Sequence, residues 1–428
     1  MCTTFLAYKI VEYLKKEQVQ FLDYPYLIRF NPNIPWKTRG NGAVAIKIKT
    51  EKTDTIKKNI TDFIKRYSAI NEGANPGLVF YQQEKIPENF SKFSKVALSQ
   101  LISRNKAKEF ATKNGIESFY LGNGQGLVGS VGAIGYSFDD HTFELISYRD
   151  ESNFGKKRVI SKESVKQMQD SSSRIFNSFD EEKNRVLIAP HGPDPVLFGV
   201  RGEDPESVLK GVSMIKTPEK FAGYMIFRSN QGTGAHLENE LDLSDLKPFS
   251  SGTIIGKISE PPKIGLGGHV IFSIVKNHKT IQCAVYKPTG LTQIVSKLIK
   301  GDLVKVGGGI RKASKNHKRT LNVEFIEVLE LEKKQKFVNP LCHFCKKRMK
   351  SKGKNQYFEC IKCNRTSKQK ILEEIPREIE KRFYVPILSA HRHLTRPLQR
   401  MGRSNKKIIF SDSKNWFYVS KLKNNHTN

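Results

Sequence analysis

The first residues of the chain show the apolar spacing of an amphipathic α-helix. Two threonines, a residue type that caps helices, precede apolar residues at i, i+4, i+7 and i+8 spacing, namely Leu6, Ile10, Tyr13 and Leu14. Beyond this helix the pattern predicts a turn-rich stretch at residues 31–42 and a strand at 43–48. A second helix is predicted at 90–113, and a glycine-rich loop at 122–135.

Between residues 150 and 245, short strands alternate with helical stretches. The predicted strands lie at 186–189, 196–200 and 224–228, and the predicted helices at 162–168 and 205–214. This alternation favours a small α+β sandwich of the ferredoxin-like type. Residues 247–252, which include Pro248, are expected to form a linker.

From residue 253 to residue 332 the apolar positions alternate with the period of a β-strand. Ile281, Cys283 and Val285, for example, fall on one face of a strand. A helical interlude at 291–299 interrupts the strands. Five strands with one inserted helix are typical of an OB barrel, and Cys283 is then expected in its core.

Four of the six cysteines form two closely spaced pairs: Cys342 with Cys345, and Cys360 with Cys363. Two residues separate the thiols of each pair, so all four sulfurs can bind one tetrahedral zinc at about 2.3 Å. Four thiolates fill the coordination shell, and the metal is therefore expected to fold a ribbon rather than to catalyse. Phe344 and Tyr357, which lie among lysines, either stack on unpaired bases or cover the small ribbon core.

The charge of the chain narrows the choice of partners. The chain has 428 residues, enough for roughly two to four domains. Lysine and arginine number 73 against 42 acidic residues, a net charge of +31, and the cations cluster at 311–319, 346–354 and 396–423. Such clusters favour a polyanion, because neutralised phosphates release counterions; a basic surface that only aids solubility is the alternative.

Membrane and secretion signals are not recognisable in the sequence. No apolar run approaches the roughly 18–20 residues that cross a bilayer, and the N-terminus lacks a basic region followed by a cleavage site. We therefore expect a cytoplasmic protein without a membrane partner, and we infer no obligate protein partner.

Two glycine-flanked segments are candidates for anion binding. In the first, Lys37, Arg39 and Asn41 either cradle an anion or are solvated turn residues. In the second, backbone amides either approach a phosphate or form ordinary turns; its residues are Gly122, Asn123, Gly124 and Gly126. This second run matches neither a Walker A loop nor a well-placed dinucleotide fingerprint.

Three further residues have a structural and a chemical interpretation. Thr3 is a helix cap, or a phosphate acceptor at a helix N-terminus, where a new anion is stabilised. His191 and Asp194 are an acid/base pair or parts of a tight turn. The turn is favoured for the latter two, because the neighbouring prolines fix it.

Five strings of residues stand out: MCTT at the N-terminus, NPNIPWKTRGNGAVA at 31–45, GNGQGLVGSVGAIG at 122–135, PHGPDPVLFGVRG at 190–202 and FRSNQGTGAHL at 227–237. The cysteine ribbon and AHRHL at 390–394 follow them. In these strings and their order, over nearly its whole length, the sequence resembles the archaeal tRNA(Ile) agmatidine synthetases.

The resemblance implies an ATP-dependent enzyme that joins agmatine to C2 of the wobble cytidine in an isoleucine tRNA with a CAU anticodon, so that the tRNA reads AUA. ATP, Mg²⁺ and a structural Zn²⁺ are the implied cofactors, and tRNA and agmatine the implied partners. The fold would be multidomain α+β. Its parts would be a kinase-like α/β domain lacking its first strand (1–150), a ferredoxin-like domain (151–245), an OB-fold β-barrel (246–335), a zinc ribbon (336–375) and a basic C-terminal segment (376–428).

The resemblance also suggests roles for single residues. Thr3 matches a threonine that becomes phosphorylated in the family, and the loops at 31–42 and 122–129 match segments around the nucleotide and the cytidine. His191, Asp194 and His236 are the candidates for substrate binding.

Two departures from the family pattern stand out. Relatives carry an acidic Gly-Ile-Asp-Asp-Thr-Asp-type strand just before the MCTT string, whose carboxylates would hold magnesium and ATP. Because the sequence begins at Met1, inside that motif, we expect a misplaced internal start and weak or no activity without the segment. Gly234 stands where relatives often have aspartate, which puts that contact in doubt.

Two other functions remain open at this level. One is a non-catalytic RNA- or single-strand-binding protein that keeps the barrel and ribbon but has lost its active site. The other, a replication or transcription zinc-ribbon factor, accounts for the C-terminal half only.

Overall fold

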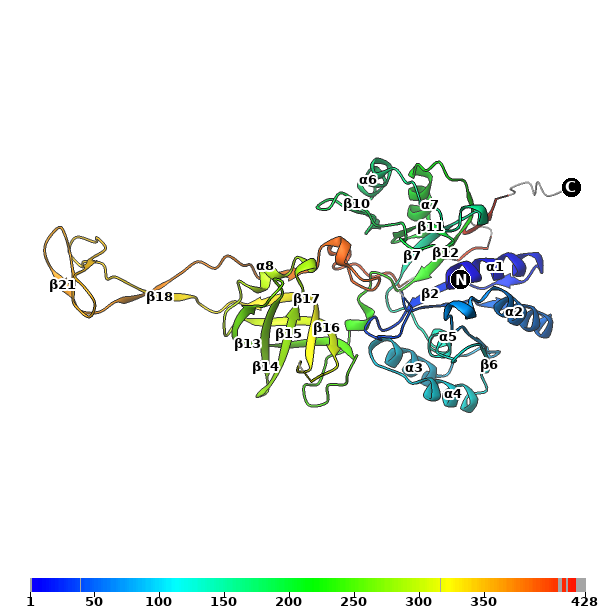
Figure 1. The fold of residues 1–428 in the computed structure, drawn as a ribbon, viewed down its shortest axis with the longest axis horizontal. Coiled ribbons are helices and arrows are strands. Elements are labelled where there is room, and N and C mark those ends of the chain that lie inside the picture. The colour runs from blue at the N-terminus through cyan, green and yellow to red at the C-terminus, as the bar shows by residue number, and fades with distance from the viewer. Residues whose placement is uncertain (1, 39, 316, 407–409, 413–414, 421–428) are drawn as a thin grey trace. The chain divides into compact units, whose positions relative to one another are not determined.

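The computed structural model describes residues 2–38, 40–315, 317–406, 410–412 and 415–420 (Figure 1). The chain divides into two compact units. The first comprises Met1–Ile254, Gly307–Glu324 and Val385–Asn428, and the second comprises Ile255–Val306 and Phe325–Tyr384. In the described residues, no helix combines the length and apolar character that crossing a bilayer demands.

A single mixed sheet forms the centre of the first unit, with the strand order β3-β2-β12-β7-β11-β8 and with β24 paired to β12. Its strands are β2 (Tyr26–Arg29), β3 (Gly42–Ala45), β7 (Thr142–Arg149), β8 (Ile175–Phe176), β11 (Val196–Gly202), β12 (Phe221–Ser229) and β24 (Phe417–Val419). β12 pairs in parallel with β2 and antiparallel with β7. Strands from both sides of residue 150 therefore share one sheet.

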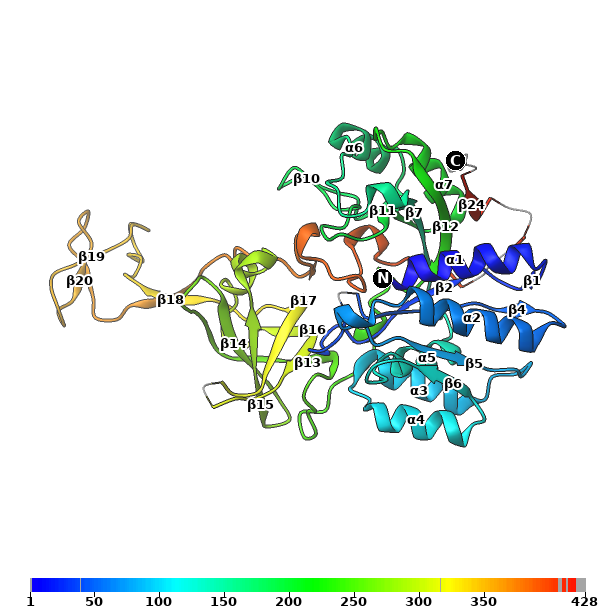
Figure 2. The same cartoon turned by 45° about the vertical axis from the view of Figure 1, so that its right-hand side comes forward.

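Four helices pack on this sheet and bury their apolar faces in one core. They are α1 (Thr3–Lys16), α2 (Thr53–Tyr67), α6 (Lys162–Asp170) and α7 (Pro205–Met214). α6 and α7 lie side by side, as do α1 and α2 (Figures 1 and 2). Asp204 caps α7, its carboxylate accepting the Ser207 amide at 2.7 Å, and Pro205 occupies the first turn. The helices predicted at the N-terminus, at 162–168 and at 205–214 are confirmed.

The helix predicted at 90–113 is wrong as a single element. The structure has α3 (Glu88–Ser99) and α4 (Arg104–Lys113), because Ser103 accepts the Lys106 amide at 3.2 Å and so starts a new helix. α5 (Gly126–Ile134) occupies most of the predicted glycine-rich loop. It packs beside the pair β5 (Gly77–Phe80) and β6 (Glu117–Tyr120).

Close packing of backbones explains why that helix begins with glycine. A Cβ on Gly126 would lie 2.6 Å from the carbonyl oxygen of Asn75, so no side chain fits there. The sequence showed the glycines but not the neighbour that requires them.

The remaining short elements of the first unit change the bounds of two further predicted strands. They are the pairs β1 (Gln20–Phe21) with β4 (Ile48–Lys49) and β9 (Phe179–Asp180) with β10 (Arg185–Val186). The strand predicted at 43–48 is divided between β3 and β4, and the strand predicted at 186–189 is β10, which ends at Val186. Among the described residues, the 3₁₀ helices are Ile70–Glu72, Glu151–Asn153, Ala235–Leu237, Lys287–Thr289, Leu388–Ala390 and Leu398–Arg400.

Five strands close a barrel in the order β15-β14-β13-β16-β17, with β17 returning to β15 and β23 (Phe383–Tyr384) at its edge. They are β13 (Ser251–Ile264), β14 (Val270–Lys276), β15 (Lys279–Val285), β16 (Leu303–Arg311) and β17 (Thr320–Glu330). The helical interlude is the short α8 (Thr292–Val295), between β15 and β16. Order and inserted helix are those of an OB fold, and Cys283 is fully buried as predicted.

The ribbon follows the barrel strands in the chain. β18 (Gln335–Val338) pairs with β22 (Ile371–Glu374) at its base, and β19 (Lys350–Ser351), β20 (Phe358–Glu359) and β21 (Thr366–Ser367) form a small sheet. After the ribbon, Arg377 makes a bidentate ion pair with the fully buried Asp302, with nitrogen–oxygen distances of 2.7 and 2.9 Å. The same guanidinium donates to the carbonyls of Glu332 and Lys297.

Candidate zinc centre and polyanion cavity

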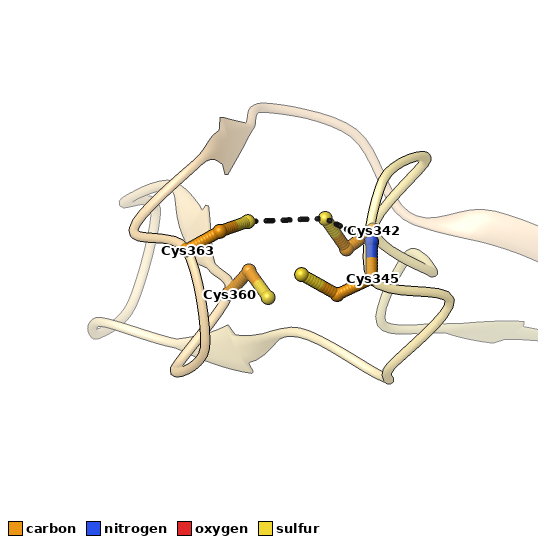
Figure 3. A group of neighbouring side chains, drawn as sticks. All are labelled: Cys342, Cys345, Cys360 and Cys363. Atoms are coloured by element: carbon orange, nitrogen blue, oxygen red, sulfur yellow. Dashed lines mark hydrogen bonds between the residues drawn. The ribbon is translucent and has the colours of Figure 1, made fainter.

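The four ribbon cysteines converge on one point. Their sulfur atoms all lie within 4.8 Å of one another, and the Sγ atoms of Cys342 and Cys363 are 3.5 Å apart. Figure 3 shows the four side chains directed toward a common centre. In a regular tetrahedron of zinc–sulfur bonds of about 2.3 Å, the sulfurs are about 3.8 Å apart. The described geometry therefore fits a zinc ion.

Two matching turns place these thiols. Lys346 donates its amide to the Cys342 carbonyl at 2.8 Å, and Asn364 does the same to Cys360 at 2.8 Å. Both Lys346 and Asn364 have a φ of +56°, a left-handed conformation that folds the chain back after each pair. The Cys345 amide also points at the Cys342 sulfur, and this contact lowers the pKa of the Cys342 thiol.

The ribbon aromatics are exposed rather than part of a core. Met349 and Phe358 are the buried apolar residues around the cysteines, whereas Phe344 is 71% exposed and Tyr357 44% exposed. The Arg365 guanidinium lies 4.6 Å from the centroid of the Phe344 ring. Neither aromatic is buried in the ribbon core, and base stacking stays a prediction.

A cavity of about 470 Å³ lies in the first unit. Strand β2 and the loop after it contribute Arg29, Lys37 and Gly40, and β11 contributes Arg201. The C-terminal segment adds Arg392 and two histidines, His391 and His393. Within the described lining there is no carboxylate, so the cavity suits a polyanion.

A buried carboxylate below the cavity holds two of its arginines. Glu144, on β7, lies 3.1 Å from the Arg201 Nε and 3.9 Å from an Arg29 terminal nitrogen, and it accepts a hydrogen bond from Gln231. The Nδ1 of His393 lies 2.8 Å from the Gln231 Oε1 and 3.1 Å from the Arg201 Nη2. These contacts join three sheet strands and the C-terminal segment into one framework.

Glycine gives the Arg29 guanidinium its space. A Cβ on Gly42 would lie 2.8 Å from the Arg29 Nη1. Burial lowers the pKa of Arg29, and the Glu144 carboxylate opposes that effect. Burial also lowers the pKa of Lys37, with a further contribution from Arg392. An anion bound in the cavity would oppose the lowering of the pKa of both Arg29 and Lys37.

The first predicted anion loop is only partly in the cavity. Lys37 lines it, whereas Arg39 lies outside the described residues. Asn41 has a structural role: its side chain donates to the Asn31 carbonyl at 2.8 Å, and its own carbonyl accepts the Phe30 amide.

The second predicted anion loop uses two of its amides for hydrogen bonds within the protein. The Asn123 amide donates to the Asn75 side chain at 2.8 Å, and the Gly126 amide to the Asn75 carbonyl at 3.0 Å. Gly122 and Gly124 both have positive φ, which forms the turn before α5. The structure thus gives these four residues a local turn role, and phosphate binding there stays a prediction.

The remaining predicted residues are separated by the structure. Thr3 is exposed in the first turn of α1. The preceding residue, Cys2, is close enough to Arg29 to contribute to its pKa, in the upward direction. His191 lines the cavity beside Arg185, whereas the Asp194 carbonyl accepts from Arg158 at 2.6 Å.

Arg158 also binds the carbonyls of Pro190, Gly192 and Val196, so it fixes the whole proline turn. The turn interpretation is therefore the one that the contacts favour. His236 is fully buried, 3.0 Å from the Glu324 carboxylate, and does not line the cavity.

Sequence reasoning missed Arg29, Arg201 and Glu144. Arg29 and Arg201 are the only charged residues of β2 and β11, and Glu144 shares β7 with Arg149. Only the pairing of β2, β7, β11 and β12 brings the three residues together. The one available signal was a charge at a position that the strand pattern buries.

Fold and sites together define a modular RNA-handling protein in which a polyanion cavity accompanies an OB barrel and a zinc ribbon. Family models match three segments: the TiaS TCKD domain at residues 1–123, the TiaS FLD domain at 124–236 and the TiaS C-terminal zinc ribbon domain at 339–379. The chain belongs to the TiaS family, the 2-agmatinylcytidine synthetases of isoleucine tRNA.

Individual relatives agree over almost the whole length. The synthetase of Cenarchaeum symbiosum (strain A) is 44% identical over 419 residues, which cover 98% of this chain and 94% of the relative. A solved complex of TiaS with its isoleucine tRNA and ATP matches with a TM-score of 0.83 at 33% identity, covering 96% of both chains. A complex of TiaS with the same tRNA, AMPCPP and agmatine matches with a TM-score of 0.82 at 31% identity, again over 96% of both.

Proposed function

We propose that the chain is an ATP-dependent ligase that conjugates agmatine to C2 of the wobble cytidine of the CAU-anticodon isoleucine tRNA, which allows AUA to be decoded. The observation that carries the proposal is a carboxylate-free basic cavity in a chain of this family. The relatives of known structure include complexes with isoleucine tRNA, ATP and agmatine.

The chemistry explains why such a cavity is needed. The C2 oxygen of cytosine is a poor leaving group, so ATP must first transfer a phosphoryl group to it. The neutral amine of agmatine then attacks C2, the C2–O bond breaks, phosphate departs with the oxygen, and the amine releases a proton to a base. Fixed cations stabilise the charge that develops on the transferred group.

The cavity residues fit this role as anion holders. Arg201 and Arg29 would bind phosphate oxygens with geometry that Glu144 fixes from below, and Lys37 and Arg392 would add charge at the rim. ATP, when bound, supplies the phosphoryl group. Mg²⁺ remains an expectation from the family, because the described lining offers it no carboxylate.

Thr3 is proposed as the residue that becomes phosphorylated, on the family's motif. Its position supports the assignment, because Thr3 is exposed and lies in the first turn of the 14-residue helix α1, where an added anion is stabilised. The wobble base must leave its stack to be reached, which costs a few kcal/mol. We assign the holding of the tRNA to the barrel and the ribbon.

A direct test incubates the purified protein with ATP, agmatine and an isoleucine tRNA transcript that has a CAU anticodon. The chain is used as it stands and also with an acidic Gly-Ile-Asp-Asp-Thr-Asp-type strand added at its N-terminus. Mass spectrometry of the anticodon nucleosides should show the mass of an added agmatine on cytidine. A transcript with a UAU anticodon is the control. If neither form of the protein changes the cytidine mass, the proposal is wrong.

The remaining assignment concerns location. Because its proposed substrate is tRNA, we propose that the protein acts in the cytoplasm.

A further inference from the structure

Two segments that are distant in the sequence hold Arg392 at the rim of the basic cavity. The Nη1 of its guanidinium donates to the Asn33 Oδ1 at 2.7 Å and lies 3.1 Å from the Glu324 Oε1. Among the described residues, the Nε and Nη2 of Arg392 make no hydrogen bond, and its side chain is 38% exposed. One side of the guanidinium is therefore fixed, and the other side can receive an anion.

Glu324, on β17, is a charged anchor for this guanidinium. Its side chain is 8% exposed, and its Oε2 lies 3.0 Å from the His236 Nε2. Burial alone would raise the pKa of Glu324, but His236 and Arg392 hold it below its usual range. The carboxylate is therefore ionised at neutral pH. It offsets part of the repulsion between Arg392 and Lys37, the neighbour whose pKa Arg392 lowers.

Asn33 joins the guanidinium to two further strands of the barrel. Its side-chain nitrogen donates to the hydroxyl of Ser251, the first residue of β13, at 2.8 Å. A Cβ on Gly309, in β16, would overlap both the Oδ1 and the Nδ2 of Asn33. Glycine at 309 therefore leaves the room that the Asn33 side chain needs in order to reach Arg392.

The backbone at Asn33 is fixed without help from Arg392. The Asn31 Oδ1 accepts the backbone amide of Asn33 at 2.9 Å, and the Asn31 Nδ2 donates to the Phe249 carbonyl at 2.8 Å. Asn31 is itself fully buried. These residues, together with Ser251, Gly309 and Glu324, all belong to the first unit. Loss of the Asn33 side chain should therefore release Arg392 and leave the loop folded.

We propose that Asn33 is a positioning residue of the basic cavity, which orients Arg392 so that the free side of the guanidinium binds phosphate oxygens. Asn33 is not part of the described cavity lining and acts through Arg392. Ser251, Gly309 and Glu324 set the orientation of the pair from three strands of the barrel. That the anion is a phosphate rests on the proposed function. Such a phosphate can belong to ATP or to the RNA, and the experiment separates these two sources.

The test measures binding of the ATP analogue AMPCPP, and of the isoleucine tRNA transcript with a CAU anticodon, to the full chain by calorimetry. Asn33→Ala should weaken binding of the phosphate ligand about three- to tenfold, because a mobile Arg392 must then be immobilised on binding. Arg392→Ala should weaken it at least as much. Adding Asn33→Ala to Arg392→Ala should cause no further loss, because the residue through which Asn33 acts is then absent.

Gly309→Ala provides a second, independent perturbation. The added methyl group displaces the Asn33 side chain, so this variant should reproduce the loss of affinity of Asn33→Ala and should also lower the melting temperature. In the double variant with Asn33→Ala the overlap is absent. Its melting temperature should therefore recover toward that of Asn33→Ala alone, and its affinity should fall no further. Two unrelated structural defects would add instead.

Ser147→Ala controls for a loss of stability. It removes a buried hydroxyl of β7 that donates to the Phe198 carbonyl at 3.2 Å, and it should lower the melting temperature without changing either affinity. In turnover, Asn33→Ala should raise the KM for the ligand that it affects and leave kcat unchanged. A merely structural defect would lower kcat through the fraction of folded protein and leave KM unchanged.

The pattern of losses identifies the phosphate. Weaker binding of AMPCPP alone assigns Arg392 to the nucleotide, weaker binding of tRNA alone assigns it to the RNA backbone, and weaker binding of both assigns it to a site that the two share. The proposal is overturned if Asn33→Ala and Gly309→Ala change neither affinity, if Asn33→Ala still weakens binding in the absence of Arg392, or if the wild-type chain binds neither ligand. A chain that shows the expected losses and never modifies cytidine would refute the proposed function alone.

Discussion

The clearest quantitative prediction concerns the ion pair between Arg377 and Asp302. Among the described residues, Asp302 is the one ion-paired carboxylate whose side chain is 0% exposed. Arg377→Met removes the cation that pairs with it. Truncating one partner of a buried ion pair costs about 3–5 kcal/mol, because the other charge stays buried and unpaired. Two carbonyls, those of Glu332 and Lys297, lose a donor as well. For a unit of about a hundred residues, this cost corresponds to a melting temperature lower by more than about 10 °C.

A second ion pair of the same unit provides the control. Arg348 and Glu373 are also 2.7 Å apart, but both side chains are 43% exposed. Exposed pairs contribute about 0.2–1 kcal/mol, so Arg348→Met should lower stability by no more than that. The shortest nitrogen–oxygen distance is the same in the two pairs, so the comparison sets a buried bidentate pair against an exposed single contact.

Urea denaturation measures the free energy of unfolding of both variants. Hydrogen exchange is then measured in peptides from β16, β17 and β23. In the double variant, Asp302→Asn with Arg377→Met, the residue at 302 no longer carries a charge, so its cost should be smaller than the sum of the single variants. Asp302 also accepts the amides of Ile299 and Glu332 at 2.8 Å each, and so part of the loss should remain. Equal losses for Arg377→Met and Arg348→Met would refute the reasoning.

Three further predictions concern the ribbon, a helix cap and the charged surface. Cys345→Ser should release zinc, measured by metal analysis, and should speed hydrogen exchange in residues 339–379 but not in α7; retained zinc would contradict the ribbon assignment. Asp204→Ala should cost about 0.5–2 kcal/mol, and Asp204→Asn less, because asparagine also caps helices. Burial alone would raise the pKa of Asp204, but the Ser207 amide and Arg174 hold it below its usual range. The contribution of the carboxylate to stability is therefore complete above about pH 4 and is lost as the pH falls through the lowered pKa, so acid titration of the wild type and Asp204→Asn should converge only at low pH. Binding of tRNA should weaken linearly in a plot of log affinity against log salt concentration, and a flat plot would show that the cationic surface is not the docking face.

The sequence predicted those parts of the fold whose signal is local. The start of α7 follows from Asp204 and Pro205, and the cysteine spacing was enough to predict the ribbon site. The break between α3 and α4 was missed, although Ser103 offered a cap, because the apolar periodicity continues across it. Likewise, the glycines at 122–126 indicated an anion loop, and only the neighbouring Asn75 shows that the amides of Asn123 and Gly126 bond within the protein.

The candidate sites were harder to predict because they depend on contacts between distant segments. Glu144 and Arg201 lie on two strands, Gln231 follows a third, and His393 comes 162 residues after Gln231. Nothing in the local pattern of any one strand indicates that its charge will meet the others. A family resemblance supplies that missing information only at the level of strings, and for this reason it pointed to the loop of Lys37 but not to Glu144 beneath it.

The positive charge of the basic cavity suits the proposed reaction for a physical reason. A phosphorylated cytidine and a dicationic amine attract each other, but a protonated amine cannot attack C2. The arginines held by Glu144 would bind the phosphate. Positive charge around the reaction centre also disfavours an ammonium there, which lowers the pKa of the attacking amine toward the neutral form that the reaction requires. The same cations would then serve both to bind the phosphate and to keep the nucleophile unprotonated.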